Sequence, residues 1–174
     1  GAGTGRIARP LIRENLQYTG LELSKKYCNF ANKQLNVILD KKCIIQGDMR
    51  AFNLDKKFDI IFIGFNSLLH LLTEQNVKKC LESIKKHMHN KSQLYIDIFV
   101  PHPLFLYRPN NTSLHVVDFY DSQEKCEAKI YENLQYDNKD EIAHVEWTYL
   151  NQTTEKSYYT FKFQMKMYYP DTMN

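Results

Sequence analysis

The sequence predicts an α/β fold, in which an open, doubly wound, mostly parallel sheet is followed by antiparallel β-hairpins that form an insertion or a small second sheet. In the first part of the chain, short apolar runs alternate with amphipathic helix patterns, which favours parallel strands joined by crossover helices. From Leu114 to Tyr169, apolar and polar residues alternate and turn-forming residues separate the runs. This second pattern is typical of antiparallel strands.

The parallel part is expected to contain four strands and three helices. Strands are predicted over residues 18–23, 42–48, 58–65 and 92–100. Helices are predicted over residues 7–16, 24–35 and 73–88. The first helix should begin at about the last glycine of "GAGTG", because Pro10 is tolerated only near a helix start. Ser24 is the expected N-cap of the second helix. The continuous apolar run "FDIIFIGF" predicts a strand that is buried on both faces.

The sequence pattern changes after Pro101 and Pro103, from alternating strand and helix patterns to alternating apolar and polar residues. We therefore divide it into a core over residues 1–103 and an antiparallel insertion or lid over residues 104–174, both within one domain. The hairpins of the insertion are expected to cover a substrate. Exposed sheet edges would make self-association of two copies plausible.

Composition excludes several classes of function. The chain has 174 residues and a net charge of +3, and its lysines are spread in pairs along the sequence, which argues against a nucleic-acid interface. No run approaches the length of a membrane span. The four cysteines form no C-x-x-C pair and no signal-peptide pattern is present, which favours reduced thiols in the cytoplasm. We expect no metal site, and we interpret His87 and His89 as cations at a helix end.

Polar and glycine-rich segments follow the predicted parallel strands. Ligands of doubly wound sheets bind beyond the carboxyl ends of the strands. The opening glycines can cradle a ligand against bare backbone, although glycine clusters are also ordinary loops. Glu22 is placed to bind the hydroxyls of a ribose, and Asp48 to bind an adenine amino group. The alternative is that both acids are exposed strand-end residues or helix caps.

The glycine spacing separates two enzyme classes that share this layout. A dinucleotide-binding turn has the pattern G-x-G-x-x-G. Gly1, Gly3 and Gly5 give G-x-G-x-G instead, and Arg6 stands where the third glycine of that pattern belongs. This spacing disfavours a nicotinamide-dependent oxidoreductase.

Four segments, "GAGTGR", "GLELS", "GDMRAF" and "FDIIFIGFNSLLHL", resemble in order and separation the class I S-adenosylmethionine-dependent methyltransferases, in particular small bacterial members with an antiparallel insertion. The resemblance implies a Rossmann-like fold, S-adenosylmethionine as cofactor, and methyl transfer to a nitrogen or oxygen of a small molecule. It also implies roles in cofactor binding for Gly1, Ala2, Gly3, Thr4, Gly5, Glu22, Leu23, Asp48, Met49, Phe65 and Asn66. Phe65 also has an ordinary interpretation as a core aromatic residue.

A methyl transfer to nitrogen or oxygen needs the loss of a proton, so a base is expected near the site. His70 and Asp97 are the candidate catalytic residues, because both lie at predicted strand ends. His70 can equally be a hydrogen-bonded histidine at a helix start. A domain of the same fold that binds a nucleoside or a protein without catalysis is the alternative to an enzyme.

The family places a buried strand before the glycine turn, and this strand is the centre of its sheet. No such strand precedes Gly1 in this sequence, and the family's last helix and strand pair are also absent. We therefore expect the 174 residues to be an internal piece of a longer protein. Without its central strand, the sheet would have backbone groups that need another partner.

Overall fold

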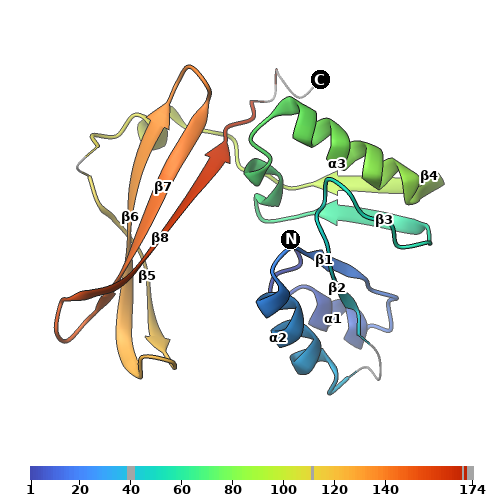
Figure 1. Cartoon of the computed structure of the whole chain (residues 1–174), viewed down its shortest axis with the longest axis horizontal. Helices are drawn as coiled ribbons and strands as arrows, with labels where there is room; N and C mark the ends of the chain where they lie inside the picture. Colours follow the sequence, from blue (N-terminus) through green and yellow to red (C-terminus); the bar gives the residue numbers. More distant parts are fainter. Residues whose placement is uncertain (39–41, 111, 170, 172–174) are drawn as a thin grey trace. The chain divides into compact units, whose positions relative to one another are not determined.

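The structure, a computed structural model, describes residues 1–38, 42–110, 112–169 and 171. Its contacts divide the chain into two compact units. The first unit comprises Gly1–Leu68 and Glu74–Ile98, and the second comprises Leu69–Thr73 and Phe99–Asn174. The first unit contains parallel strand pairs with helices and the second contains an antiparallel sheet (Figure 1). The predicted α/β fold is therefore confirmed.

The first strand pair of the first unit is β1 (Gly20–Glu22) with β2 (Ile44–Gln46), which run parallel. Helix α2 (Lys25–Leu35) contacts both strands. As predicted, Ser24 caps this helix, and its Oγ accepts the Tyr27 N–H at 3.3 Å. The hydrophobic core beside this pair is formed by Ala8, Ile12, Cys28, Ala31, Leu35, Cys43 and Ile44.

Helix α1 (Ala8–Arg13) is shorter than the sequence predicted. Asn15 adopts φ 60° and ends the helix, with the Asn15 N–H donating to the Ile12 carbonyl and the Leu16 N–H donating to the Leu11 carbonyl. These two bonds form a Schellman motif, which satisfies the last helical carbonyls. The prediction that Leu16 belongs to the helix was wrong for this reason.

The second strand pair is β3 (Phe58–Ile63) with β4 (Met88–Ile96), also parallel, and helix α3 (Glu74–Lys86) precedes β4 (Figure 1). A short 3₁₀ helix, η1 (Ser67–His70), follows β3. The predicted burial of β3 on both faces was wrong, because Ile60 is 58% exposed and Phe62 is 39% exposed. Within the described residues β3 pairs only with β4, so its other edge is open.

His87 follows α3 directly, but it is not the cation that the sequence predicted. Its side chain is buried, its Nε2 accepts the Leu54 N–H at 2.9 Å, and its Nδ1 lies 2.7 Å from the Ser83 carbonyl oxygen. A carbonyl only accepts, so Nδ1 carries the proton and Nε2 carries a lone pair. These contacts hold the imidazole in its neutral form.

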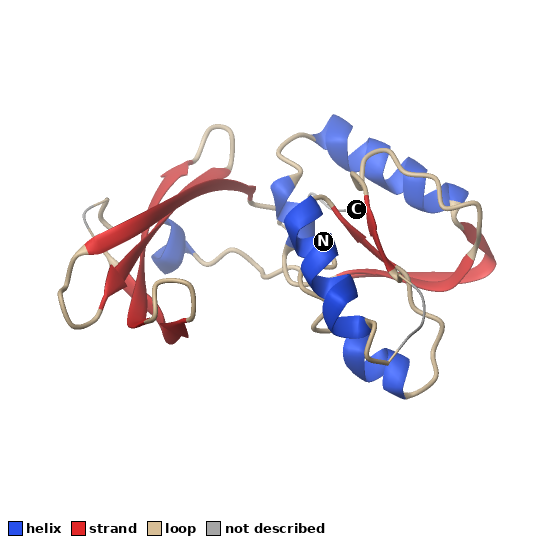
Figure 2. Ribbon diagram, turned by 60° about the horizontal axis from the view of Figure 1, so that its bottom comes forward, coloured by secondary structure: helices blue, strands red, loops and turns tan. Residues whose placement is uncertain are grey.

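The second unit is a four-stranded antiparallel sheet in the order β5-β6-β7-β8 (Figures 1 and 2). Its strands are β5 (Leu114–Asp121), β6 (Cys126–Asp137), β7 (Ile142–Asn151) and β8 (Ser157–Lys166), and the short helix α4 (Pro103–Leu106) precedes them. Ile130, Leu134 and Val145 are buried on one face of the sheet. The predicted antiparallel hairpins are therefore confirmed.

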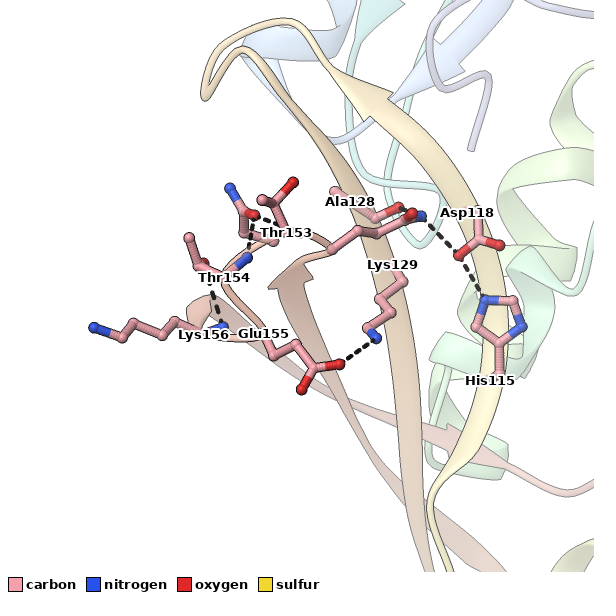
Figure 3. Close-up of polar contacts among 10 residues, drawn as sticks. His115, Asp118, Ala128, Lys129, Thr153, Thr154, Glu155 and Lys156 are labelled. Atoms are coloured by element: carbon pink, nitrogen blue, oxygen red, sulfur yellow. Dashed lines mark hydrogen bonds and ion pairs between the residues drawn. The ribbon is translucent and has the colours of Figure 1, made fainter.

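The turn between β7 and β8 is fastened to the rest of the sheet by side chains (Figure 3). The Gln152 side-chain amide donates to Asp118 Oδ1 at 3.0 Å on β5 and to the Ala128 carbonyl at 3.1 Å on β6. Lys129 and Glu155 form an ion pair at 3.7 Å across the same region. These contacts tie the last hairpin to both preceding strands.

Candidate functional site

The opening glycine turn has a backbone that only glycine adopts easily. Gly3 has φ 56° and Gly5 has φ 81°, both in the left-handed region. A Cβ built on Gly3 would meet no heavy atom within 4 Å, so the backbone there is open to a ligand. Thr4 is exposed on the same turn, and the Gly5 N–H donates to the Ala2 carbonyl at 3.2 Å.

Glu22, at the end of β1, connects the glycine turn to the sheet. Its side chain is buried, with the residue 8% exposed. Oε2 accepts the Gly3 N–H at 2.8 Å, and Oε1 accepts the Ser24 N–H at 2.9 Å. A carboxylate offers about four lone-pair positions, so each oxygen retains the capacity to accept one further hydrogen bond. The alternative of an exposed strand-end residue is therefore excluded for Glu22.

Asp48, which follows β2, is held by an arginine two residues later. Arg50 donates from Nε to Asp48 Oδ1 at 3.0 Å and from Nη2 to Oδ2 at 2.5 Å. The Arg50 backbone N–H also donates to Oδ1 at 2.9 Å. The hydrogen bonds from Arg50 hold the pKa of the Asp48 carboxyl below its ordinary value. Asp48 is therefore a fixed anion at the rim of the sheet.

The turn after β3 carries Phe65 and Asn66 in left-handed conformations, with φ 51° and 59°. The Phe65 side chain is 59% exposed, and the Arg6 guanidinium carbon lies 4.2 Å from its ring centroid. This exposure excludes the interpretation of Phe65 as an ordinary core residue. Left-handed non-glycine residues store strain of about 1–3 kcal/mol each, so other contacts must hold the turn.

The segments predicted to form the site meet at the carboxyl ends of the strands. The Gly47 N–H donates to the Glu22 carbonyl at 2.9 Å, which places the end of β2 beside the end of β1. A Cβ on Gly1 would lie 2.6 Å from Ser67 Oγ, so the glycine turn also adjoins the segment after β3. Leu23 lies between these segments in sequence and is 66% exposed. Glu22 and Asp48 thus share one rim with the opening residues.

A groove of about 790 Å³ lies beside this rim. Residues 58–64 line it along the length of β3, and residues 18–21 line it on the side of β1. Its apolar lining also includes Ile7, the N-cap residue of α1, Ile84 from α3, and Met49 from the turn after β2. At its end, the Leu21 carbonyl accepts hydrogen bonds from the nitrogens of Gly1 and Ala2, at 3.0 and 2.9 Å.

The two predicted catalytic residues belong to different units of the structure. Asp97, directly after β4, belongs to the first unit, and His70 belongs to the second. His70 Nδ1 lies 3.3 Å from the Gln164 carbonyl oxygen, and its ring lies 6.1 Å from that of Phe163. Because a carbonyl only accepts, Nδ1 donates its proton in this contact.

The partners that fix the predicted residues were not predicted from the sequence. Asp-x-Arg in "GDMR" is a spacing at which one side chain can reach the other, and it could have indicated the contact between Asp48 and Arg50. Asp97 accepts the N–H of Phe65 in the turn after β3. No local sequence pattern predicts this contact, because the two residues are far apart in sequence.

Two classes of site are absent from the described part of the chain. Its histidine, cysteine and acidic side chains form no group of three or more that could hold a metal ion. None of the helices within the described ranges has the length and apolar character that a membrane span requires.

Comparison with known proteins supplies a family. A family profile described as "Methyltransferase domain" matches residues 1–91. A curated relative, dTDP-3-amino-3,4,6-trideoxy-alpha-D-glucopyranose N,N-dimethyltransferase from Streptomyces venezuelae, is 31% identical over 86 residues. This match covers 49% of the chain and 35% of the relative, so it spans about a third of that protein.

Solved structures with low sequence identity share the fold. A S-adenosylmethionine-dependent methyltransferase from Clostridium acetobutylicum ATCC 824 has a TM-score of 0.79 at 17% identity, covering 99% of this chain and 66% of that one. The sugar N-methyltransferase KedS8 from Streptoalloteichus sp ATCC 53650 has a TM-score of 0.76 at 18% identity, covering 98% and 64%. The chain therefore spans slightly less than two thirds of these neighbours.

Proposed function

Since the chain belongs to the methyltransferase-domain family and has the Rossmann-like fold of class I methyltransferases, we propose that it binds S-adenosylmethionine and transfers its methyl group to a nitrogen of a small molecule. The observation that carries the proposal is the contact of Glu22 with the glycine turn. One carboxylate holds the Gly3 N–H and the Ser24 N–H and keeps acceptor capacity for the hydroxyls of a ribose.

Each predicted site residue has a role in this proposal. The backbone of residues 1–5, from Gly1 through Ala2, Gly3 and Thr4 to Gly5, lies against the methionine part of the cofactor. The exposed Leu23 side chain packs on the adenine ring with Met49, and the Asp48 carboxylate accepts the adenine amino group. Phe65 and Asn66 face the methionine part from the other side of the rim.

The cofactor supplies an activated methyl group, so the protein must align the acceptor and exclude water. The acceptor lone pair forms a bond to the methyl carbon as the bond from carbon to the sulfonium sulfur breaks, which leaves a neutral thioether. The methylated nitrogen then loses a proton. His70 is the proposed base, because its contact with the Gln164 carbonyl uses Nδ1 and leaves Nε2 outside that hydrogen bond.

An amine is favoured over a hydroxyl because the curated relative is named as an N,N-dimethyltransferase and a structural neighbour as a sugar N-methyltransferase. A small amino sugar is therefore the first substrate class to test. The covering of this substrate by the antiparallel sheet stays a prediction. So do the cytoplasmic location, the absence of nucleic-acid and membrane partners, and the association of copies through sheet edges.

The groove between β1 and β3 is proposed to seat a further strand that leads into the glycine turn, as the family resemblance implies. The nitrogens of Gly1 and Ala2 already bond to Leu21 on the edge of β1, and β3 lines the groove along its length. A strand there would pair with both open edges and cover the apolar lining. A chain extended at its amino end should then bind the cofactor more tightly than residues 1–174 alone.

Calorimetric titration of the extended protein with S-adenosylhomocysteine tests the proposed function, with NAD as the ligand of the rival class. Binding of S-adenosylhomocysteine but not NAD is expected. Glu22→Gln should abolish measurable binding, because its amide nitrogen opposes one of the two backbone N–H donors. Glu14→Gln, on the exposed end of α1, is the matched control and should bind normally. Binding of NAD alone would overturn the proposal.

A test of transfer separates an enzyme from a binding domain. Labelled S-adenosylmethionine is incubated with the protein and small amino sugars, and label in the sugar is measured. Incorporation that is lost in His70→Gln, with unchanged S-adenosylhomocysteine affinity, would support His70 as the base. Cofactor binding without incorporation into any amine would favour the non-catalytic alternative.

A further inference from the structure

The turn after β3 is held in a conformation that its own residues disfavour. Phe65 and Asn66 are consecutive, both carry a Cβ, and both have left-handed φ values of 51° and 59°. Such a pair persists only where surrounding contacts determine it, and these strained residues gather at binding sites. The contacts that hold this turn therefore bear on what the site does.

Asp97 supplies these contacts from the end of the neighbouring strand β4. Its Oδ2 accepts the Phe65 N–H at 3.0 Å, and its carbonyl accepts the Asn66 N–H at 3.1 Å. Its own N–H donates to the Ile63 carbonyl at 2.8 Å, which continues the pairing of β3 with β4. Asp97 thus bonds to both strained residues. Its side chain bonds to Phe65, and its backbone carbonyl bonds to Asn66.

The turn displays the Phe65 ring beside the glycine turn. The ring is 59% exposed, and a cation already lies at its face, with the Arg6 guanidinium carbon 4.2 Å from the centroid. Arg6 directly follows Gly5. An aromatic face attracts a cation through its quadrupole, so this ring is suited to a second cation that reaches the same rim.

We propose that Asp97 is a positioning residue, whose carboxylate fixes the turn of Phe65 and Asn66 so that the Phe65 ring contacts the sulfonium of the bound cofactor. This inference rests on the proposed function. It assigns Asp97 a positioning role in place of the earlier expectation of a base, on the ground that its Oδ2 accepts the Phe65 N–H. Asp97 acts through Phe65 and takes no proton from the substrate.

The affinities for two cofactor forms isolate the contact with the cation. S-adenosylmethionine carries a sulfonium, whereas S-adenosylhomocysteine carries a neutral thioether. The dissociation constant of S-adenosylmethionine divided by that of S-adenosylhomocysteine therefore reports that contact. Asp97→Ala should raise this ratio about fivefold, since the ring loses its fixed position. Phe65→Leu should raise it by a similar factor, and the double variant should raise it no further.

Conservative and control variants sharpen the measurement. Asp97→Asn keeps an oxygen that accepts the Phe65 N–H, so the ratio should stay near that of the natural protein. Glu82→Ala removes an exposed carboxylate from α3 and should leave the ratio unchanged. The proposal is overturned if Asp97→Asn behaves like Asp97→Ala, or if Asp97→Ala shifts the ratio equally in the Phe65→Leu background.

A measurement without ligand tests the hold of Asp97 on the turn independently. Glycine adopts left-handed φ without strain, so Asn66→Gly should raise the melting temperature more in the natural protein, where Asp97 holds the turn, than in the Asp97→Ala background, where the turn can relax. Equal increments in both backgrounds would show that Asp97 does not hold the turn. Failure of both cofactor forms to bind the natural protein would instead overturn the proposed function, and with it the sulfonium contact, whatever the melting result.

Discussion

The two units of the molecule are stabilised in different ways. In the second unit, β6 and β7 are 12 and 10 residues long, and they pair in continuous register. In the first unit, β1 and β2 have three residues each. There the side chains of Glu22 and Asn32 form hydrogen bonds to backbone groups that the short strands do not pair. The strand pair that carries Glu22 therefore depends on individual side chains, whereas the antiparallel sheet depends mainly on backbone pairing.

A buried ion pair against the sheet gives the largest expected effect. Arg108 is 9% exposed, and its Nη2 donates to Glu132 Oε1 at 2.8 Å, while Trp147 Nε1 donates to Glu132 Oε2 at 2.8 Å. Glu132→Ala leaves the guanidinium buried without its counter-ion, which costs about 3–5 kcal/mol. Urea unfolding followed by Trp147 fluorescence should show this loss.

A matched variant on the same strand separates charge burial from strand propensity. Glu127 lies on β6 but is exposed, so Glu127→Ala should change the free energy of unfolding by about 0.5 kcal/mol or less. Replacing both Arg108 and Glu132 by apolar residues of similar size should restore much of the stability. If the double variant is as unstable as Glu132→Ala, the buried charge is not the cause.

In the first unit, Asn32 is the side chain on which the short strand pair depends most. Asn32 is buried on α2, and its side chain bonds to the edge of β2 that faces away from β1. Its Oδ1 accepts the N–H groups of Cys43 and Ile44, each at 3.1 Å, and its Nδ2 donates to the Ile44 carbonyl at 2.7 Å. Asn32→Ala removes these partners from buried backbone groups, which costs about 3 kcal/mol.

Amide hydrogen exchange resolved along the chain measures this effect in each unit. Asn32→Ala should speed exchange in β1, β2 and α2, and leave β6 and β7 protected. Asn29→Ala, exposed on the same helix, is the control and should leave exchange unchanged. Equal acceleration in both units would contradict the view that they are stabilised separately.

The sequence analysis predicted the parts of this architecture that local patterns determine. Alternation over residues 114–169 gave the antiparallel strands, and "SKKY" gave the cap of α2, because strand period and capping are encoded in neighbouring residues. The order of motifs at strand ends also placed Glu22 with the glycine turn, since parallel strands end on one edge.

What the sequence analysis missed depends on contacts between distant residues. The neutral state of His87 follows from Leu54, which lies far from it in the chain. The hold of Asp97 on Phe65 joins the ends of two strands that are separated by a helix. The exposure of Ile60 depends on which strands pair with β3, and an apolar run cannot report that.

The pH dependence of stability should also differ between the units. Burial raises the pKa of the Cys80 thiol on α3 from 9.0 to about 11. The folded state then favours the protonated thiol, so this stability is fully present below the unfolded pKa and is lost as pH rises from about 9 to about 11. The loss should be about 2 kcal/mol. Urea unfolding of the first unit, followed by circular dichroism, measures it.

Variants of two cysteines assign the slope. Cys80→Ala should make the dependence above about pH 9 shallower, because the Cys80 thiol no longer ionises. The buried Cys28 thiol, whose pKa burial also raises, should keep part of the slope. Cys126→Ala, in the second unit, should keep the slope of the natural protein. An unchanged slope in Cys80→Ala would show that another group governs alkaline unfolding.

The smallest expected effect on stability belongs to Arg50, although this residue fixes part of the candidate site. The Arg50 and Asp48 side chains are 44% and 30% exposed, so Arg50→Ala should leave the free energy of unfolding nearly unchanged. Its effect on the cofactor should be larger at low pH. Loss of the Arg50 hydrogen bonds returns the pKa of Asp48 toward its ordinary range, so the carboxylate becomes protonated at a pH where it is still ionised in the natural protein.

A protonated Asp48 accepts the adenine amino group less well, and the S-adenosylhomocysteine affinity of Arg50→Ala should therefore fall between about pH 5 and about pH 3, while that of the natural protein holds to lower pH. Calorimetric dissociation constants across this range measure the difference, and Arg13→Ala, exposed on α1, is the control for lost positive charge. A constant affinity ratio across the range would mean that Asp48 does not bind the adenine. In that case the first unit would use Arg50 and Asp48 only to fasten a turn, as the second unit uses Gln152.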